Sequence, residues 1–170
     1  MKHFLYGAIA GLALLFGLAT VVQSQTITQS NQVSQSVASW TPVLTFATPG
    51  DLSVAYTTQS GTYSRQGRRI VIHCQIVTSS FTHFTASGVL RVTGLPFNAS
   101  AAITTAFAPV AFGGITKANY TTITSQIVAS GGNISFIASG SGQAVSTVTA
   151  ADLPTGGTVV LDFTTTYLAD

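Results

Sequence analysis

The amino-acid sequence predicts an all-β protein, an antiparallel β-sandwich of jelly-roll type preceded by one N-terminal hydrophobic helix. Three observations support this prediction. Ser and Thr supply 44 of the 170 residues (18 Ser and 26 Thr), beside 16 Gly, and this composition favours strands and turns over helices. From Trp40 onward, short runs of β-branched and aromatic residues alternate with turn residues too closely for crossover helices. Before them, residues 4–22 form one apolar run.

The apolar run at residues 4–22 carries no charge and follows one basic residue, Lys2. As a helix, a run of this length spans about 28 Å, close to the thickness of the hydrocarbon core of a bilayer, so we expect a transmembrane anchor. The alternative is a cleaved secretory signal, with Lys2 as its positive region and cleavage near Val22 to Ser24. The length of the run and its imperfect cleavage motif favour the anchor.

Residues 23–39 are rich in Gln and Ser and hold few apolar residues. The apolar positions Ile27, Val33 and Val37 are spaced by six and four, which fits neither a heptad repeat nor an alternating strand. We expect a linker or stalk between the hydrophobic segment and the head.

Residues 40–170 form the predicted head domain, a single β-sandwich. Its clearest strand places Ile70, Ile72, Cys74 and Ile76 on one face. In the last strand, the residues from Val159 to Tyr167 at every second position form the buried face. The candidate strands are 41–47, 52–58, 61–65, 69–78, 87–93, 101–112, 119–129, 133–138, 143–149 and 157–168.

Charge is scarce in this chain. Six basic and four acidic residues give a net charge of +2, too sparse for the basic surface that nucleic-acid binding requires, so we expect no nucleic-acid partner. With so few charges, the outer faces of the sandwich must carry Thr, Ser, Ala and Val, a surface that favours symmetric self-association.

Candidate catalytic and metal-binding residues are also few. Asp51 and Asp162 are the only plausible pair of catalytic carboxylates, and Asp51 follows a Pro-Gly turn, which favours a structural role. His73 and Cys74 point to opposite faces of one strand and cannot share a metal. The less favoured alternative is that His73 or His83 lies near a three-fold axis and three copies supply the ligands. We therefore expect no catalytic residue, no metal site, no cofactor and no enzymatic activity.

Arg65, Arg68 and Arg69 form the one local basic cluster, in a turn between two candidate strands. Such a cluster could bind a carboxylate, a phosphate or a sulfated sugar. Solvated turn residues are the favoured interpretation. The residues that would bind a receptor are not identified by any motif.

The segments WTPVLTF, GTYSRQGRRIVIHCQIVTS, GVLRVTGLPF and LPTGGTVVLDFTTTYLAD occur in this order from Trp40 to the last residue. This order resembles the C-terminal head domains of bacteriophage tail-fibre and receptor-binding proteins. The positions that carry the resemblance are Trp40, Pro42, Gly61, Tyr63, Gly67, Gly94, Leu95, Pro96, Phe97 and Tyr167. The resemblance implies a jelly-roll or tumour-necrosis-factor-like head that forms a homotrimer and presents loops to a host surface receptor or glycan.

The hydrophobic segment at residues 4–22 departs from that family, whose chains assemble in the host cytoplasm without one. A membrane-containing phage particle would reconcile the two features. We therefore expect a virion structural protein, a membrane-anchored spike or fibre-like trimeric head for host attachment, with other virion proteins and a lipid membrane as partners. The alternative is an exported bacterial surface protein, secreted or on the cell surface, that serves as an adhesion or carbohydrate-binding module.

Overall fold

The computed structural model describes residues 36–102 and 105–170. The chain divides into two compact units, Met1–Gln32 and Val33–Asp170, and the described residues belong to the second. The predicted hydrophobic segment at 4–22 and most of the predicted linker at 23–39 lie outside the described residues. Within the described part, no helix is long and apolar enough to span a membrane.

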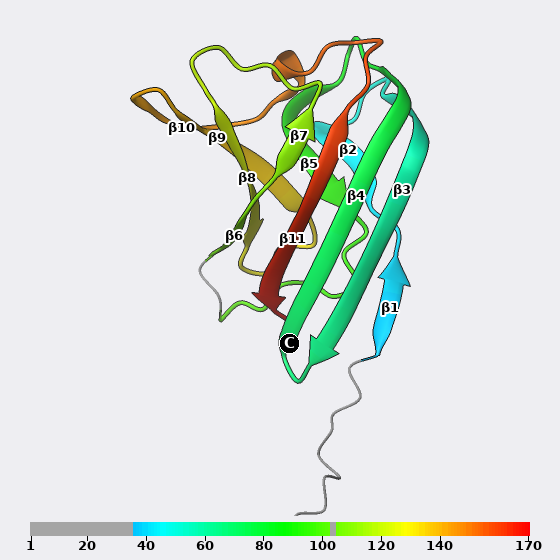
Figure 1. The fold of residues 1–170 in the computed structure, drawn as a ribbon, viewed down its shortest axis with the longest axis vertical. Helices are drawn as coiled ribbons and strands as arrows, with labels where there is room; N and C mark the ends of the chain where they lie inside the picture. Colours follow the sequence, from blue (N-terminus) through cyan, green and yellow to red (C-terminus); the bar gives the residue numbers. More distant parts are fainter. Residues whose placement is uncertain (1–35, 103–104) are drawn as a thin grey trace, which may run out of the picture. The chain divides into compact units, whose positions relative to one another are not determined.

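Two antiparallel sheets make up the described unit (Figure 1). The first sheet has the strand order β1-β3-β4-β11-β7. Its strands are β1 (Val37–Trp40), β3 (Ser53–Gln66), β4 (Arg69–Thr82), β11 (Val160–Leu168) and β7 (Ala111–Gly113). The second sheet has the order β2-β5-β9-β8-β6, with β10 paired to β9. Its strands are β2 (Val43–Thr48), β5 (Ser87–Thr93), β9 (Ile134–Gly140), β8 (Thr122–Val128), β6 (Thr105–Pro109) and β10 (Gln143–Thr147).

The two sheets pack face to face around one hydrophobic core. Phe136 of β9 and Phe163 of β11 meet edge to face across the sheets, with ring centroids 5.8 Å apart. Phe46 of β2 and Phe81 of β4 make a second such contact at 5.9 Å. Because each strand alternates its side chains between core and solvent, the residue pattern fixes which face each sheet buries. The described residues therefore form a β-sandwich, as the alternating strands predicted.

The buried faces of β4 and β11 agree with the sequence. Ile70, Ile72, Cys74 and Ile76 have no exposed surface, and Leu161, Phe163, Thr165 and Tyr167 are all buried. The register pairs Cys74 with Phe163 and Ile72 with Thr165, so the two apolar rows lie side by side in one sheet.

The fold-class prediction is wrong in one respect: the described residues contain no α-helix, and their one helical element is a 3-10 turn at Ala150–Asp152 (η1). The N-terminal helix that the sequence predicted has no support in the structure. The jelly-roll type and the tumour-necrosis-factor-like head that the resemblance implied are not confirmed by the strand order or by the structural comparison. β1 begins at Val37, inside the range assigned to the linker.

Candidate functional site

Trp40, the first residue of the motifs that carry the resemblance, packs inside the fold. Its indole Nε1 donates a hydrogen bond to the carbonyl oxygen of His73 at 3.1 Å. Its ring lies against Gly61, the register partner of Trp40 on the neighbouring strand. The side chain is 8% exposed. Trp40 and Gly61 therefore hold the edge strand β1 onto the sheet and are not available to a ligand.

A second group of motif residues packs around Phe97. Tyr63 and Phe97 pack edge to face with ring centroids 5.7 Å apart, and the Tyr167 hydroxyl donates to the Phe97 carbonyl oxygen at 2.8 Å. The Arg65 guanidinium lies 4.6 Å from the centre of the Phe97 ring. Burial raises the pKa of Tyr167 to about 12. These motif residues stabilise the fold, so a binding surface must lie elsewhere on the molecule.

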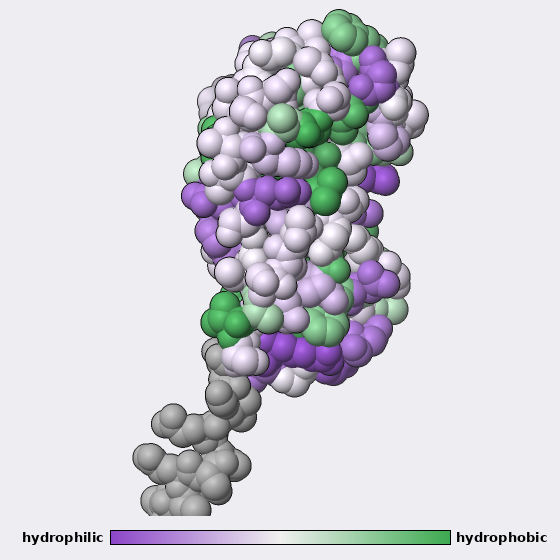
Figure 2. Space-filling model, turned by 90° about the vertical axis from the view of Figure 1, so that its right-hand side faces the viewer, coloured by the Kyte–Doolittle hydropathy of each residue, from purple (hydrophilic) through white to green (hydrophobic). Residues whose placement is uncertain are grey.

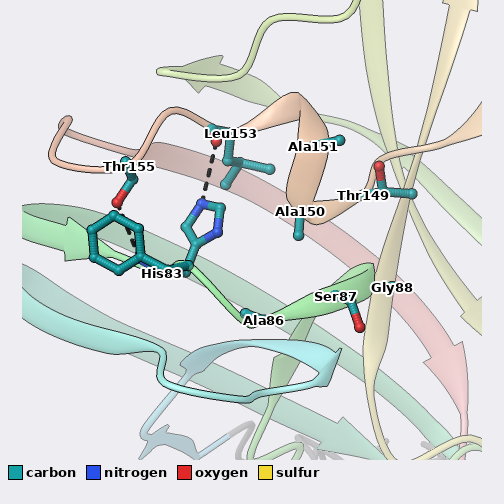
Figure 3. Close-up of a pocket in the computed structure, with 10 residues that line it drawn as sticks. His83, Ala86, Ser87, Gly88, Thr149, Ala150, Ala151, Leu153 and Thr155 are labelled. Carbon is teal, nitrogen blue, oxygen red and sulfur yellow. Dashed lines mark hydrogen bonds between the residues drawn. The ribbon is translucent and has the colours of Figure 1, made fainter.

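A hollow lies between the end of β4 and the start of β5 on one side and the η1 segment on the other (Figure 3). Its volume is about 520 Å³, within the range of small-molecule sites. The lining residues are His83, Phe84, Ala86, Ser87, Gly88, Thr149, Ala150, Ala151, Leu153 and Thr155. No Asp, Glu, Lys or Arg is among them, so the lining carries no carboxylate, ammonium or guanidinium group.

Asp51 holds the first wall of this hollow. Its carboxylate accepts hydrogen bonds from the backbone N–H groups of Phe84 and Thr85, at 2.9 and 2.7 Å, and from the Thr85 hydroxyl at 3.0 Å. These bonds, the one from Phe84 first, lower the pKa of Asp51 to about 2. The sequence placed Asp51 in a turn with a structural role, and its contacts agree with that role.

Asp152 holds the second wall. It closes a capping box with Thr149, whose N–H and hydroxyl donate to Asp152 Oδ2 at 2.8 and 3.0 Å. Lys117 Nζ donates to the same carboxylate at 2.9 Å. Burial raises the pKa of Asp152, but the hydrogen bonds from Lys117 and Thr149 outweigh it, so the pKa lies below its usual range. The charge of Asp152 is thus neutralised behind the hollow.

His83 stands between the two walls. Its ring packs against Phe46 and Phe81, with centroid distances of 5.1 and 5.2 Å. Nε2 lies 3.2 Å from the carbonyl oxygen of Leu153, and the backbone N–H of His83 donates to the Thr155 hydroxyl at 3.2 Å (Figure 3). From the sequence, a solvated or hydrogen-bonded His on a strand was the favoured interpretation of His83, and a metal ligand on a symmetry axis was the less favoured one. Its place in the hollow could not be predicted, because its partners lie about seventy residues away.

His73 and Asp162 lie on the outer face of the first sheet, away from the hollow. Asp162 Oδ1 is 3.8 Å from His73 Nδ1, and Asp162 Oδ2 accepts a hydrogen bond from Gln75 at 3.1 Å. Asp51 and Asp162 share no contact partner, so the structure does not bring the candidate carboxylate pair together. Cys74 points into the core, where burial raises its pKa to about 12. Within residues 36–102 and 105–170, no cluster of three potential metal ligands occurs.

Arg65 and Arg68 of the basic cluster have separate partners. Arg68 pairs with Asp170 at 2.8 Å and also donates to the Ser100 hydroxyl and the Ala169 carbonyl oxygen. Arg65 donates to the Gly67 carbonyl oxygen at 2.8 Å and stacks on Phe97. Arg69 is exposed at the start of β4. The cluster therefore does not converge on one anion site.

The outer face of the second sheet carries one charged residue, Arg91. One register row across this face consists of Thr45, Arg91, Ser135, Gln126 and Phe107. On the same face, Val43, Phe107 and Val128 are 41%, 55% and 44% exposed. The Arg91 Nε is buried without a hydrogen-bond partner among the described residues. Pale surface of intermediate hydropathy, with small hydrophilic and hydrophobic patches, also dominates the side of the molecule in Figure 2.

Comparison with known proteins identifies a related fold. No protein-family model matches the chain, and no curated protein matches it. Among solved structures, the crystal structure of the Dettilon tailspike protein (gp208) superposes with a TM-score of 0.55 at 16% sequence identity. The match covers 76% of this chain but 23% of the tailspike chain, so this protein spans about a quarter of that tailspike's length. At this identity the likeness establishes a shared β-fold, and the described unit has the fold of part of a tailspike protein.

Proposed function

We propose that this protein is a virion component of spike or fibre type, a head that attaches a phage particle to a host surface. The observation that carries the proposal is the fold shared with part of a tailspike protein over 76% of the chain. The order of motifs from Trp40 to Tyr167, which resembles phage tail-fibre heads, supports the same function. The motif residues whose contacts are described above stabilise the fold, so this resemblance supports the type of head and does not identify its receptor.

The proposed head is not an enzyme. Asp51 is bound to two backbone N–H groups and Asp152 to Lys117 and Thr149, so neither carboxylate is free to transfer a proton. Asp162 lies on a sheet face beside His73 and Gln75. Hydrolysis of a glycosidic bond needs two carboxyl groups facing one another, and these contacts favour a binding role.

The proposed head forms a homotrimer through the outer face of its second sheet. Each strand of the first sheet except β1 and β7 carries a charged residue or His, whereas Arg91 is the single charge on the strands of the second. Exposed Val43, Phe107 and Val128 add apolar area to this face. Symmetric association would cover this apolar area, which a monomer leaves in water.

Attachment to a lipid membrane through residues 4–22 stays a prediction from the sequence, since that segment lies outside the described residues. The same apolar run supports the second candidate function, an exported bacterial surface adhesin or carbohydrate-binding module. The location of the protein separates the two candidates. A virion component is found in purified particles, and an exported module is found on uninfected cells.

Particle composition and competition test the proposal together. Antibodies against the purified protein should label purified phage particles in electron microscopy, and the purified protein should reduce attachment of those particles to host cells. The heat-denatured protein is the matched control and should not compete. Absence of the chain from purified particles would overturn the proposal, and its presence on uninfected cells would favour the exported module.

A further inference from the structure

We infer that the hollow between residues 83–88 and 149–155 binds one uncharged sugar unit. The inference rests on the proposed function for the source of that sugar, a glycan on the host surface. The site itself is argued from the residues that line it. Its volume of about 520 Å³ is ample for one pyranose ring with its hydroxyl groups.

His83 offers a hydrogen-bond acceptor to this ligand. Its Nε2 lies 3.2 Å from the carbonyl oxygen of Leu153, and because a carbonyl oxygen only accepts, Nε2 carries the proton. In a neutral imidazole, Nδ1 is then an acceptor. Figure 3 shows the second ring nitrogen on the side of the ring that faces Ala150. Within the described chain, no donor is within hydrogen-bond distance of Nδ1, so a ligand hydroxyl can donate to it.

Phe84 offers an apolar surface beside that acceptor. Its side chain lines the hollow and is 80% exposed, while its backbone N–H is held by Asp51 at 2.9 Å. An aromatic side chain on an anchored backbone loses little entropy when it packs on a ligand. The C–H face of a pyranose is apolar and matches an aromatic face, whereas its hydroxyls match His83 and the Ser87 hydroxyl.

The charge and the size of the lining residues restrict the class of ligand further. The absence of Lys and Arg from the lining leaves no partner for a carboxylate, phosphate or sulfate group, so acidic sugars are disfavoured. Four small residues leave room for a ligand in the hollow: Ala86, Gly88, Ala150 and Ala151. A neutral hexose meets these conditions, because it is uncharged, has one apolar face and carries several hydroxyl donors.

Binding of neutral and acidic glycans to the purified full-length chain tests the inference. The protein is kept in a detergent without a sugar head group, since such a head group would itself occupy the site. We expect neutral glycans to bind on a glycan array, and the matching free monosaccharide to perturb NMR signals of residues 83–88 and 149–155. Phe84→Ala and His83→Phe should each weaken binding of the monosaccharide about tenfold, through lost packing and a lost acceptor.

Phe112→Ala is the matched control, because Phe112 is also exposed but does not line the hollow, and it should bind as the parent does. Circular dichroism of each variant checks its fold. Failure to bind any neutral glycan, preference for acidic glycans, or equal binding by Phe84→Ala would overturn the site. If the chain is absent from virions but binds neutral sugars here, the proposed function fails and the site stands. If the chain is a virion component but Phe84→Ala and His83→Phe leave host attachment unchanged, the proposed function stands and the sugar site is overturned.

Discussion

Trp40 and Gly61 fit together as ring and backbone: a Cβ atom added at Gly61 would lie 2.5 Å from Trp40 Nε1. The two residues face each other because they are register partners in β1 and β3. Trp40 Nε1 also donates to the carbonyl oxygen of His73 in β4. The Trp40 side chain therefore links three neighbouring strands. Gly61 is required because it has no side chain that would collide with the Trp40 ring, and not because it makes a turn.

Gly61→Ala should destabilise the protein by about 1–3 kcal/mol, because the added methyl group must displace the Trp40 ring from a packed position. Urea unfolding measures the change in free energy. Gly113→Ala is the matched control, since a Cβ there would lie at an ordinary 3.4 Å from Val160 Cβ. An equal loss of stability in both variants would contradict the packing role of Gly61.

Much of the fold could be predicted from alternation. The two faces of β4 and β11 follow directly from every second residue being apolar, and the structure buries those faces. The candidate strands 52–58 and 61–65, in contrast, were separated just before Gly61, but β3 runs without a break from Ser53 to Gln66. A glycine that gives room to an indole and a glycine that makes a turn look alike in a sequence.

The hollow could not be predicted from local pattern. Asp51 was expected to have a structural role in a turn, but its partners Phe84 and Thr85 lie more than thirty residues away and could not be predicted. His83 reaches Leu153 and Thr155 across an even longer separation. Each residue is unremarkable in its own segment, and the site exists because two sheets bring the segments together.

The lowered pKa of Asp51 leads us to expect a loss of stability in acid. Its folded pKa of about 2 lies below its ordinary 3.8, so the carboxylate form stabilises the fold. That contribution is complete above about pH 4 and is lost as the pH falls towards 2. Asp51→Asn should lower the melting temperature at pH 7, and the difference from the parent should vanish near pH 2. A difference that stays constant over this range in thermal unfolding would rule out the charged form as the cause.

Asp162→Asn should leave host attachment within a small factor of the parent. Asp162 lies on the outer face of the first sheet, away from the hollow, and an Asn side chain keeps an oxygen that accepts hydrogen bonds. Attachment is measured by competition with intact particles. If the change abolished attachment while circular dichroism and the melting temperature stayed the same, an enzymatic function would have to be considered.

The N-terminus of the mature protein should be retained, because the apolar run at residues 4–22 is longer than the usual hydrophobic region of a signal peptide. Mass spectrometry of the intact protein from its native source measures this directly. A mature chain that begins at Gln23, Ser24 or Gln25 would show that the segment is cleaved and would favour the exported module.

The Val33–Asp170 unit should form a trimer in solution. The fragment should begin at Val33, because β1 starts at Val37 and a fragment starting at Trp40 would lose most of an edge strand. A stable interface buries about 800 Å² per partner, which a face of five paired strands can supply. Light scattering at micromolar concentration should give the mass of three chains.

Charge placed on the outer face of the second sheet should prevent this association. Phe107→Lys and Val128→Lys each bring a second positive charge to the face that already carries Arg91, and an uncompensated buried charge is costly. Each variant should therefore scatter with the mass of one chain. Val37→Lys is the matched control, because Val37 is 69% exposed on the first sheet and lies outside the proposed interface. A parent fragment with the mass of one chain, or a trimer that persists in both variants and dissociates in Val37→Lys, would show that this face is not the interface.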